Sequence, residues 1–177
     1  MAGLRPVQSI GGSPYTGKVV AYGVDSGHAT LLAVGDLVRI TGQSDANGLQ
    51  EVDAAAAAQL ITGCIVGIAP NISNLEQAGL PAATGGVVYV ATDRNMLMET
   101  TSTAAVLVAD VGQNAEIVAT AATLSGGMAI SNMTLATAAF SAATAQIRLE
   151  GIKDGVLTAG GTLYVRINES TFDTVGI

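Results

Sequence analysis

The chain has 177 residues, of which 49% are hydrophobic and only 12% are charged. Its length suits one compact domain, and its composition excludes a disordered chain, which would be rich in charge and poor in hydrophobic residues. The net charge of −7, with seven Lys and Arg spread along the chain, provides no basic stripe for phosphates, so direct nucleic-acid binding is not expected.

The shortage of charge, against about 25% in average globular proteins, has two interpretations. One is extensive burial, both in a core and in interfaces between subunits or with a larger assembly, because interface cores are depleted of charged residues. The other is an Ala/Gly/Thr-rich fold with a neutral polar surface. No apolar run approaches the ~18 residues that span a bilayer, and residues 1–6 lack the apolar core of a secretory signal. We therefore expect no membrane partner and synthesis in the cytoplasm.

The first sixteen residues contain two prolines and a Gly-Gly pair, with no sustained periodicity. This pattern predicts an extended N-terminal arm over residues 1–16, followed by a single β-rich domain over residues 17–177. Arms of this kind often contact a neighbouring subunit. The candidate anchors, for a contact with a neighbouring subunit or a larger assembly, are the arm's apolar residues Leu4, Val7 and Ile10.

Short β-prone runs separated by turn residues fill the first half of the domain. The expected strands are Val19–Val24, Thr30–Val34, Leu37–Ile40 and Leu60–Ala69. Two short helices are expected between them. Asp53 can cap a turn through Ala54–Ala58, and Ser73–Glu76 matches a capping box with stop signals shortly after it.

The second half alternates between polar and apolar residues. Gln146–Glu150 and Thr162–Asn168 each place every second residue on one face, as expected for antiparallel strands with one wet side. The residues predicted to face the core are Ile147, Leu149, Leu163, Val165 and Ile167. A further strand over Val87–Ala91 precedes a turn at residues 93–95. Together these patterns predict an all-β, mainly antiparallel fold, either a β-sandwich or a β-barrel, with one or two short helices.

Motifs for nucleotide chemistry are incomplete. Gly12–Lys18 matches the first seven positions of a phosphate-binding P-loop, but Val19 stands where a Ser or Thr hydroxyl would hold Mg²⁺. Pro14 also removes a backbone donor, and the segment leads into a strand rather than into a helix. We therefore expect no cofactor at this segment.

Residues for metal or acid–base catalysis are equally sparse. His28 is the only histidine and is interpreted as an ordinary loop residue, while the single cysteine, Cys64, is expected to be a buried thiol. Paired carboxylates could serve a glycosidase, yet Glu51 with Asp53, and Glu150 with Asp154, are explained more simply as solvated strand ends or turn caps. No catalytic residue and no metal ligand is assigned. Core packing is also favoured over an adaptable binding surface for Met96 and Met98.

Three segments in the centre of the chain follow one another in a distinctive order: Val87–Asp93, Asp110–Val118 and Ala145–Ile152. With Asp36–Ile40 and Thr62–Gly67 before them, this order resembles the β-rich cement or decoration proteins of tailed-bacteriophage heads. The resemblance implies a non-enzymatic viral structural protein, located in the virion on the outer capsid surface. It would stabilise the phage head by bridging neighbouring capsid subunits, with the major capsid protein and other copies of itself as partners.

A different class of protein remains open at this point. A β-rich carbohydrate-binding or adhesion module, such as a head-fibre or tail component, would have the same fold class. The scarcity of aromatic residues, with four Tyr, two Phe and no Trp, argues against it because sugars usually stack on aromatic side chains.

Overall fold

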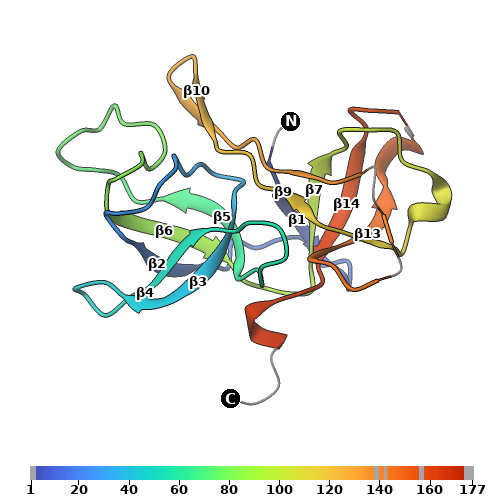
Figure 1. Ribbon diagram of the computed structural model, residues 1–177, viewed down its shortest axis with the longest axis horizontal. Helices are drawn as coiled ribbons and strands as arrows, with labels where there is room; N and C mark the ends of the chain where they lie inside the picture. Colours follow the sequence, from blue (N-terminus) through green and yellow to red (C-terminus); the bar gives the residue numbers. More distant parts are fainter. Residues whose placement is uncertain (1–2, 138–139, 142, 156–157, 174–177) are drawn as a thin grey trace.

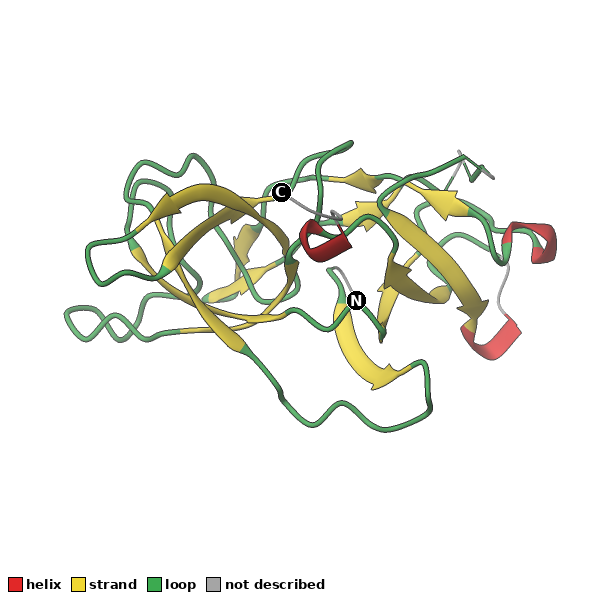
Figure 2. Cartoon of the chain, turned by 90° about the horizontal axis from the view of Figure 1, so that it is seen from below, coloured by secondary structure: helices red, strands yellow, loops and turns green. Residues whose placement is uncertain are grey.

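The computed structural model describes residues 3–137, 140–141, 143–155 and 158–173. These residues form a closed barrel and an open sheet that lie side by side along the long axis of the molecule (Figures 1 and 2). The predicted all-β, mainly antiparallel class is confirmed, and the barrel alternative is the one observed. No helix among the described residues is long and apolar enough to cross a bilayer.

Five strands close the barrel in the order β2-β4-β3-β5-β6. All neighbours are antiparallel except β2 and β4, which pair in parallel at Gly23 and Glu51. Apolar side chains fill the interior, including Val38, Ile65 and Val90, each fully buried. The strands are β2 (Val20–Val24), β3 (Leu37–Ser44), β4 (Gln50–Ala54), β5 (Gly63–Ile68) and β6 (Gly86–Ala91).

The open sheet has five antiparallel strands in the order β1-β7-β14-β13-β8. Its strands are β1 (Arg5–Ser9), β7 (Met96–Thr101), β8 (Asn114–Ala115), β13 (Ile147–Ile152) and β14 (Thr162–Ile167). Two small pairs complete the fold. They are β9 (Ile117–Val118) with β12 (Thr134–Leu135), and β10 (Thr123–Ser125) with β11 (Met128–Ile130).

The predicted alternation in β13 and β14 is confirmed. Ile147, Leu149, Leu163 and Val165 are fully buried, and Ile167 is nearly so. They belong to a core cluster that also takes side chains from the barrel strands β3, β5 and β6. The same cluster contains three residues that the sequence placed inside, namely Cys64, Met96 and Met98. One shared core therefore joins the barrel to the sheet.

The N-terminal segment differs from the expected arm. Residues 5–9 form β1, an edge strand paired with β7, and Leu4 is only 2% exposed within the shared core. The Leu4 N–H donates to the Gly35 carbonyl at 2.9 Å, and its carbonyl accepts from the Cys64 thiol at 3.2 Å. Pro6 is accommodated because an edge strand needs no donor on its outer side. An arm separate from the core is therefore wrong for residues 4–9.

Neither expected helix forms. The only helical segments among the described residues are three 3₁₀ turns: η1 (Val108–Asp110), η2 (Lys153–Gly155) and η3 (Thr171–Asp173). After Ala54 the chain stays extended, because the Ala55 N–H donates to the Leu37 carbonyl of β3. Ala58 then adopts a positive φ of 60°, which ends any helical path.

The segment Ser73–Glu76 folds into successive turns rather than a helix. The Asn71 side-chain oxygen accepts from the Ser73 N–H at 3.0 Å, and the Asn71 amide donates to the Gln77 side chain at 3.0 Å. These local bonds give the backbone an alternative to helical pairing. The helix predicted from the capping-box pattern is therefore wrong, because these residues form polar turns instead.

One buried carboxylate fixes the edge of the open sheet. Glu99 on β7 is 6% exposed and accepts from Arg5 of β1 at 2.7 Å and from Lys153 of η2 at 2.6 Å. The hydrogen bond from Lys153, followed by that from Arg5, lowers the pKa of the Glu99 carboxyl and outweighs the opposing effect of burial. The Arg5 ion pair therefore holds β1 against β7, and the Lys153 ion pair holds η2 against the same strand.

Lowering the pH should weaken the ion pairs of Glu99 with Arg5 and Lys153. Because the folded-state pKa of Glu99 lies below the unfolded value, its contribution to stability is present above the unfolded pKa and is lost as the pH falls through the folded pKa. We expect Glu99→Gln to lower the melting temperature at pH 7, and the difference from wild type to shrink below about pH 4. Thermal melts of both proteins across this range measure it. A difference that stays constant down to pH 2 would contradict the assignment.

Candidate interaction surfaces

The three apolar residues expected to contact a neighbour occupy separate environments. Leu4 is part of the core, Val7 is half-buried at the irregularity in β1, and Ile10 is 49% exposed in the turn that follows. The Ile10 N–H donates to the Asn95 carbonyl at 2.8 Å, which ties this turn to the start of β7. The structure therefore does not gather them into one contact surface, and only Ile10 is open to a partner.

Other apolar side chains are far more exposed, at the ends of two protrusions. One protrusion is the loop of residues 70–79 between β5 and β6, and the other is the β10–β11 hairpin (Figure 1). Exposed fractions of 89% and 76% are found for Ile72 and Leu75, and of 65% for Leu124 and Met128. We call these four side chains the apolar tips.

The two protrusions meet at their bases. A side chain at Gly79 would bring its Cβ within 2.6 Å of the Cβ of Ala129 on β11 and within 3.2 Å of Leu31. The hairpin turns through Gly126 and Gly127, both at positive φ, which suits a two-residue turn between twisted strands. The apolar tips therefore project from neighbouring supports.

The β10–β11 hairpin, which carries two of the apolar tips, has few contacts to stabilise it. An isolated two-stranded pair is marginal in water, and β10 is exposed at all three of its residues. Its base is fixed by Asn132, whose side-chain amide donates to the Ala121 carbonyl at 2.9 Å and to the Thr123 hydroxyl at 3.2 Å. Clustered exposed apolar residues are typical of surfaces that bind another protein.

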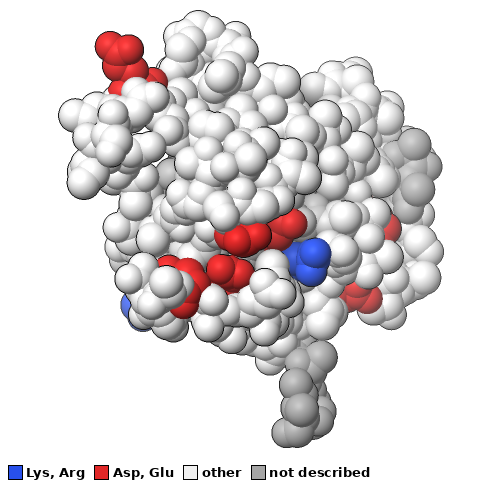
Figure 3. Space-filling view, turned by 60° about the vertical axis from the view of Figure 1, so that its left-hand side comes forward, with Lys and Arg blue, Asp and Glu red and all other residues white. Residues whose placement is uncertain are grey.

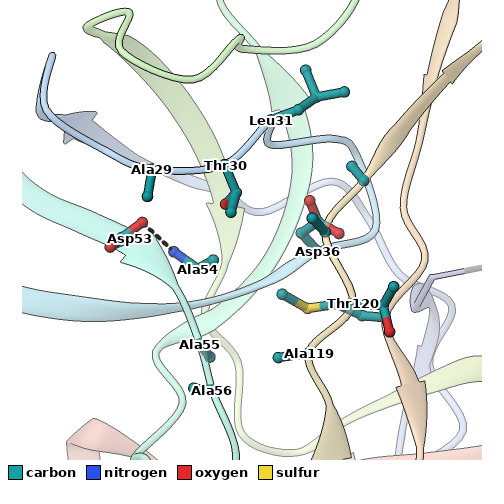
Figure 4. Close-up of a pocket in the computed structure, with 13 residues that line it drawn as sticks. Ala29, Thr30, Leu31, Asp36, Asp53, Ala54, Ala55, Ala56, Ala119 and Thr120 are labelled. Carbon is teal, nitrogen blue, oxygen red and sulfur yellow. Dashed lines mark hydrogen bonds between the residues drawn. The ribbon is translucent and has the colours of Figure 1, made fainter.

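A pocket of about 240 Å³ lies between the barrel and the segment that leads into the hairpin (Figure 4). Its walls are mainly alanines, with Leu31 and Ala122 towards the protrusions and Asp36 and Asp53 as its acidic members. Asp36 is 1% exposed and accepts from the Ala33 N–H at 2.8 Å. Burial raises the pKa of the Asp36 carboxyl, against the opposing effects of Ser131 and the Ala33 N–H. The pocket is thus lined mainly by small side chains, and it extends to the base of the hairpin.

The residues considered for catalysis are dispersed. The segment Gly12–Lys18 lies in the irregular connection between β1 and β2, not in a strand-to-helix turn. Burial raises the pKa of the fully buried Cys64 thiol, as befits a packing residue. His28 does lie in a loop, but it is buried, with Nε2 3.1 Å from the Thr84 carbonyl oxygen. Among the described residues, no three His, Cys, Asp or Glu side chains are placed to hold a metal ion.

The acidic groupings need one correction. Glu51 and Asp53 lie within β4 rather than at a solvated strand end, and Glu51 is only 7% exposed. Glu150 lies within β13, where it accepts from Arg166 at 2.7 Å and also pairs with Arg148 at 3.5 Å. The side chain of Asp154 is outside the described residues. Pairing of β4 with β3 on one side and with β2 on the other, at Glu51 itself, buries this residue and explains the error.

The apolar tips were missed from the sequence. A signal for them exists, because Ile72 and Leu75 stand alone among Asn, Ser and Glu, where no strand or helix period would bury them. Leu124 and Met128 likewise flank a Ser-Gly-Gly turn. Apolar residues in turn-rich segments without periodicity are candidates for exposure.

Comparison with known proteins adds no relative. No protein-family model matches the chain, and no curated protein and no solved structure matches it either.

Proposed function

We propose that this chain is a non-enzymatic structural protein of a tailed-phage particle, which binds the outer surface of the head and bridges neighbouring capsid subunits. The observation that carries the proposal is the exposure of Ile72, Leu75, Leu124 and Met128 on two adjoining protrusions. The order of the central sequence segments supplies the choice of a phage head as the surface. The major capsid protein and other copies of this chain are the proposed partners.

The energetics of such a contact are favourable. Removing apolar surface from water contributes about 25 cal/mol per Å², so four largely exposed apolar side chains can supply the centre of a binding patch. A contact of standard size buries about 800 Å² on each partner, and many copies on one shell would add avidity.

The proposal is tested by binding to purified capsids that lack this protein. We expect the variant Ile72→Ser/Leu75→Ser/Leu124→Ser/Met128→Ser to bind at least about tenfold more weakly than wild type, because its tips no longer gain from desolvation. Co-sedimentation with the capsids measures it, and circular dichroism confirms that the variant is folded.

A matched control uses another exposed apolar pair. Leu107 and Val108, 63% and 70% exposed, lie at the start of η1, at the opposite end of the molecule (Figure 1). The variant Leu107→Ser/Val108→Ser should bind as wild type does. Unchanged binding by the four-residue variant, or an equal loss in the control, would contradict the assignment of the tips.

A further inference from the structure

The barrel has a second hollow besides the alanine-walled pocket. A recess of about 160 Å³ opens on its outer side, well above the roughly 10 to 15 Å³ that one water occupies. Its charged and titratable members are Asp25, His28, Glu51 and Asp53, and Figure 3 shows carboxylates gathered in a hollow on this face. We call it the acidic recess. Asp53 also lines the alanine-walled pocket, so the two hollows share one wall residue.

The acidic recess contains a carboxylate without a partner. The residue Glu51 is only 7% exposed, and within the described part of the chain its carboxylate has no hydrogen bond and no ion pair. Its oxygens are not among the fully buried unpartnered atoms, so this negative charge is open to a cation from the solvent side. Asp25 and Asp53 do not relieve it, because their carboxylates accept from the nearby N–H groups of Gly27 and Ala54 and bring further negative charge.

His28 adds a hydrogen-bond acceptor to the recess. Its Nε2 lies 3.1 Å from a carbonyl oxygen, which can only accept, so Nε2 carries the proton in the neutral ring. The other nitrogen, Nδ1, is buried and has no partner among the described residues. Every unsatisfied side-chain group of Glu51 and His28 in the recess is therefore a hydrogen-bond acceptor.

One basic residue stands beside the recess. Arg39 lies opposite Asp53 in the β3–β4 pairing, but no ion pair joins it to a carboxylate of the described residues. Arg39 does not line the recess, and its buried Nε has no hydrogen-bond partner among the described residues, so the recess itself stays negative. Four of the other basic residues of this chain, Arg5, Arg148, Lys153 and Arg166, are engaged in ion pairs, whereas Lys18 is exposed and forms no ion pair with a described residue.

The geometry points to the acidic recess as a receptor for a basic side chain, arginine or lysine, supplied by the protein on which this chain docks. A guanidinium presents five N–H donors and an ammonium three, which matches a recess of acceptors and negative charge. This inference rests on the proposed function, in that the apolar tips and the recess would engage the same partner. It adds the chemistry of that partner, which must project a cation beside an apolar groove.

The recess is tested first without any capsid. The full chain, labelled with ¹⁵N, is titrated with N-acetyl-arginine amide, and with the uncharged analogue N-acetyl-citrulline amide as the matched probe. We expect the arginine probe alone to shift the backbone resonances of Glu51, Asp53 and His28. The variant Glu51→Gln/Asp53→Asn should lose these shifts. The assignment would be overturned by equal shifts with the citrulline probe, or by shifts that persist in the variant. It would also be overturned if the arginine probe caused no shifts at tens of millimolar, or if Ca²⁺ at equal concentration displaced it.

Capsid binding supplies the second readout. We expect Glu51→Gln/Asp53→Asn to bind capsids about tenfold more weakly, while Glu116→Gln/Glu169→Gln, which removes the same charge elsewhere, binds as wild type does. Loss in both variants would overturn the specific role of the recess. If wild type binds the arginine probe but no capsid, the proposed function fails and the recess stands. If the variant of the apolar tips binds capsids more weakly but the arginine probe does not bind the chain, the role of the recess is wrong and the proposed function stands.

Discussion

Replacing Gly63 with alanine is expected to lower the free energy of unfolding by about 3 kcal/mol or more, because the barrel cannot close around the added methyl group. Gly63 begins β5, where the chain crosses closely over β6. A Cβ at this position would fall on the Ala91 carbonyl oxygen and lie 2.7 Å from Cγ1 of Val90. Backbone cannot move aside as a flexible side chain can, so the two strands must separate.

The matched control is another glycine of the same strand. At Gly67 an added Cβ would meet its nearest neighbour, Cδ2 of Tyr89, at an ordinary 3.4 Å. Gly67→Ala should therefore change stability by less than about 1 kcal/mol. Urea unfolding of both variants, followed by circular dichroism, measures the difference. Equal midpoints for Gly63→Ala and wild type would show that the barrel is not packed as described.

Replacing Gln146 with methionine is the second change expected to have a large effect, at about 3 kcal/mol or more. Gln146 is fully buried, and its amide nitrogen donates to the carbonyls of Ala56 at 2.8 Å and Gln59 at 2.6 Å. Its side-chain oxygen accepts from the Ile117 N–H at 3.1 Å. One side chain thus joins the loop after β4 to β9 at the start of β13.

Methionine keeps the volume but removes all three hydrogen bonds. The buried Ile117 N–H and the half-buried Gln59 carbonyl lose the partner that Gln146 gives them, at about 1 to 3 kcal/mol for each buried group, while the Ala56 carbonyl keeps only the 3.4 Å bond from the Gln59 N–H. Gln113 provides the control, because its side-chain amide also donates to a carbonyl, that of Ala109 at 3.1 Å, but in an exposed turn. Gln113→Met should stay within about 0.5 kcal/mol of wild type. If the two methionine variants unfold at the same urea concentration, Gln146 does not link the two halves of the fold.

The elements with local periodicity could be predicted from the sequence. In β13 and β14 the alternation alone identifies the buried face, since successive side chains of a strand point to opposite sides. Barrel closure could not be foreseen, because the parallel contact of β2 with β4 depends on register between segments that no local pattern relates. The N-terminal strand was missed for a similar reason: Arg5 pairs with Glu99, far away in the chain.

The candidate surfaces were less predictable than the fold. The spacing of Glu51 and Asp53 by two residues is visible in the sequence and puts both on one side of a strand. Their convergence with Asp25 and His28 is not visible, because it is set by β2 lying beside β4. Propensity also misled at Ala54–Ala58, where the hydrogen bond from Ala55 to Leu37 overrides the helical preference of alanine.

The copy number of this chain in purified phage particles tests the proposed function most directly. Quantitative mass spectrometry of intact particles gives the ratio of this chain to the major shell protein. A head-stabilising protein that bridges capsid subunits should be present at a ratio near one, or at a simple fraction set by the symmetry of the shell. Absence from the particles, or a handful of copies per particle, would contradict a role over the capsid surface.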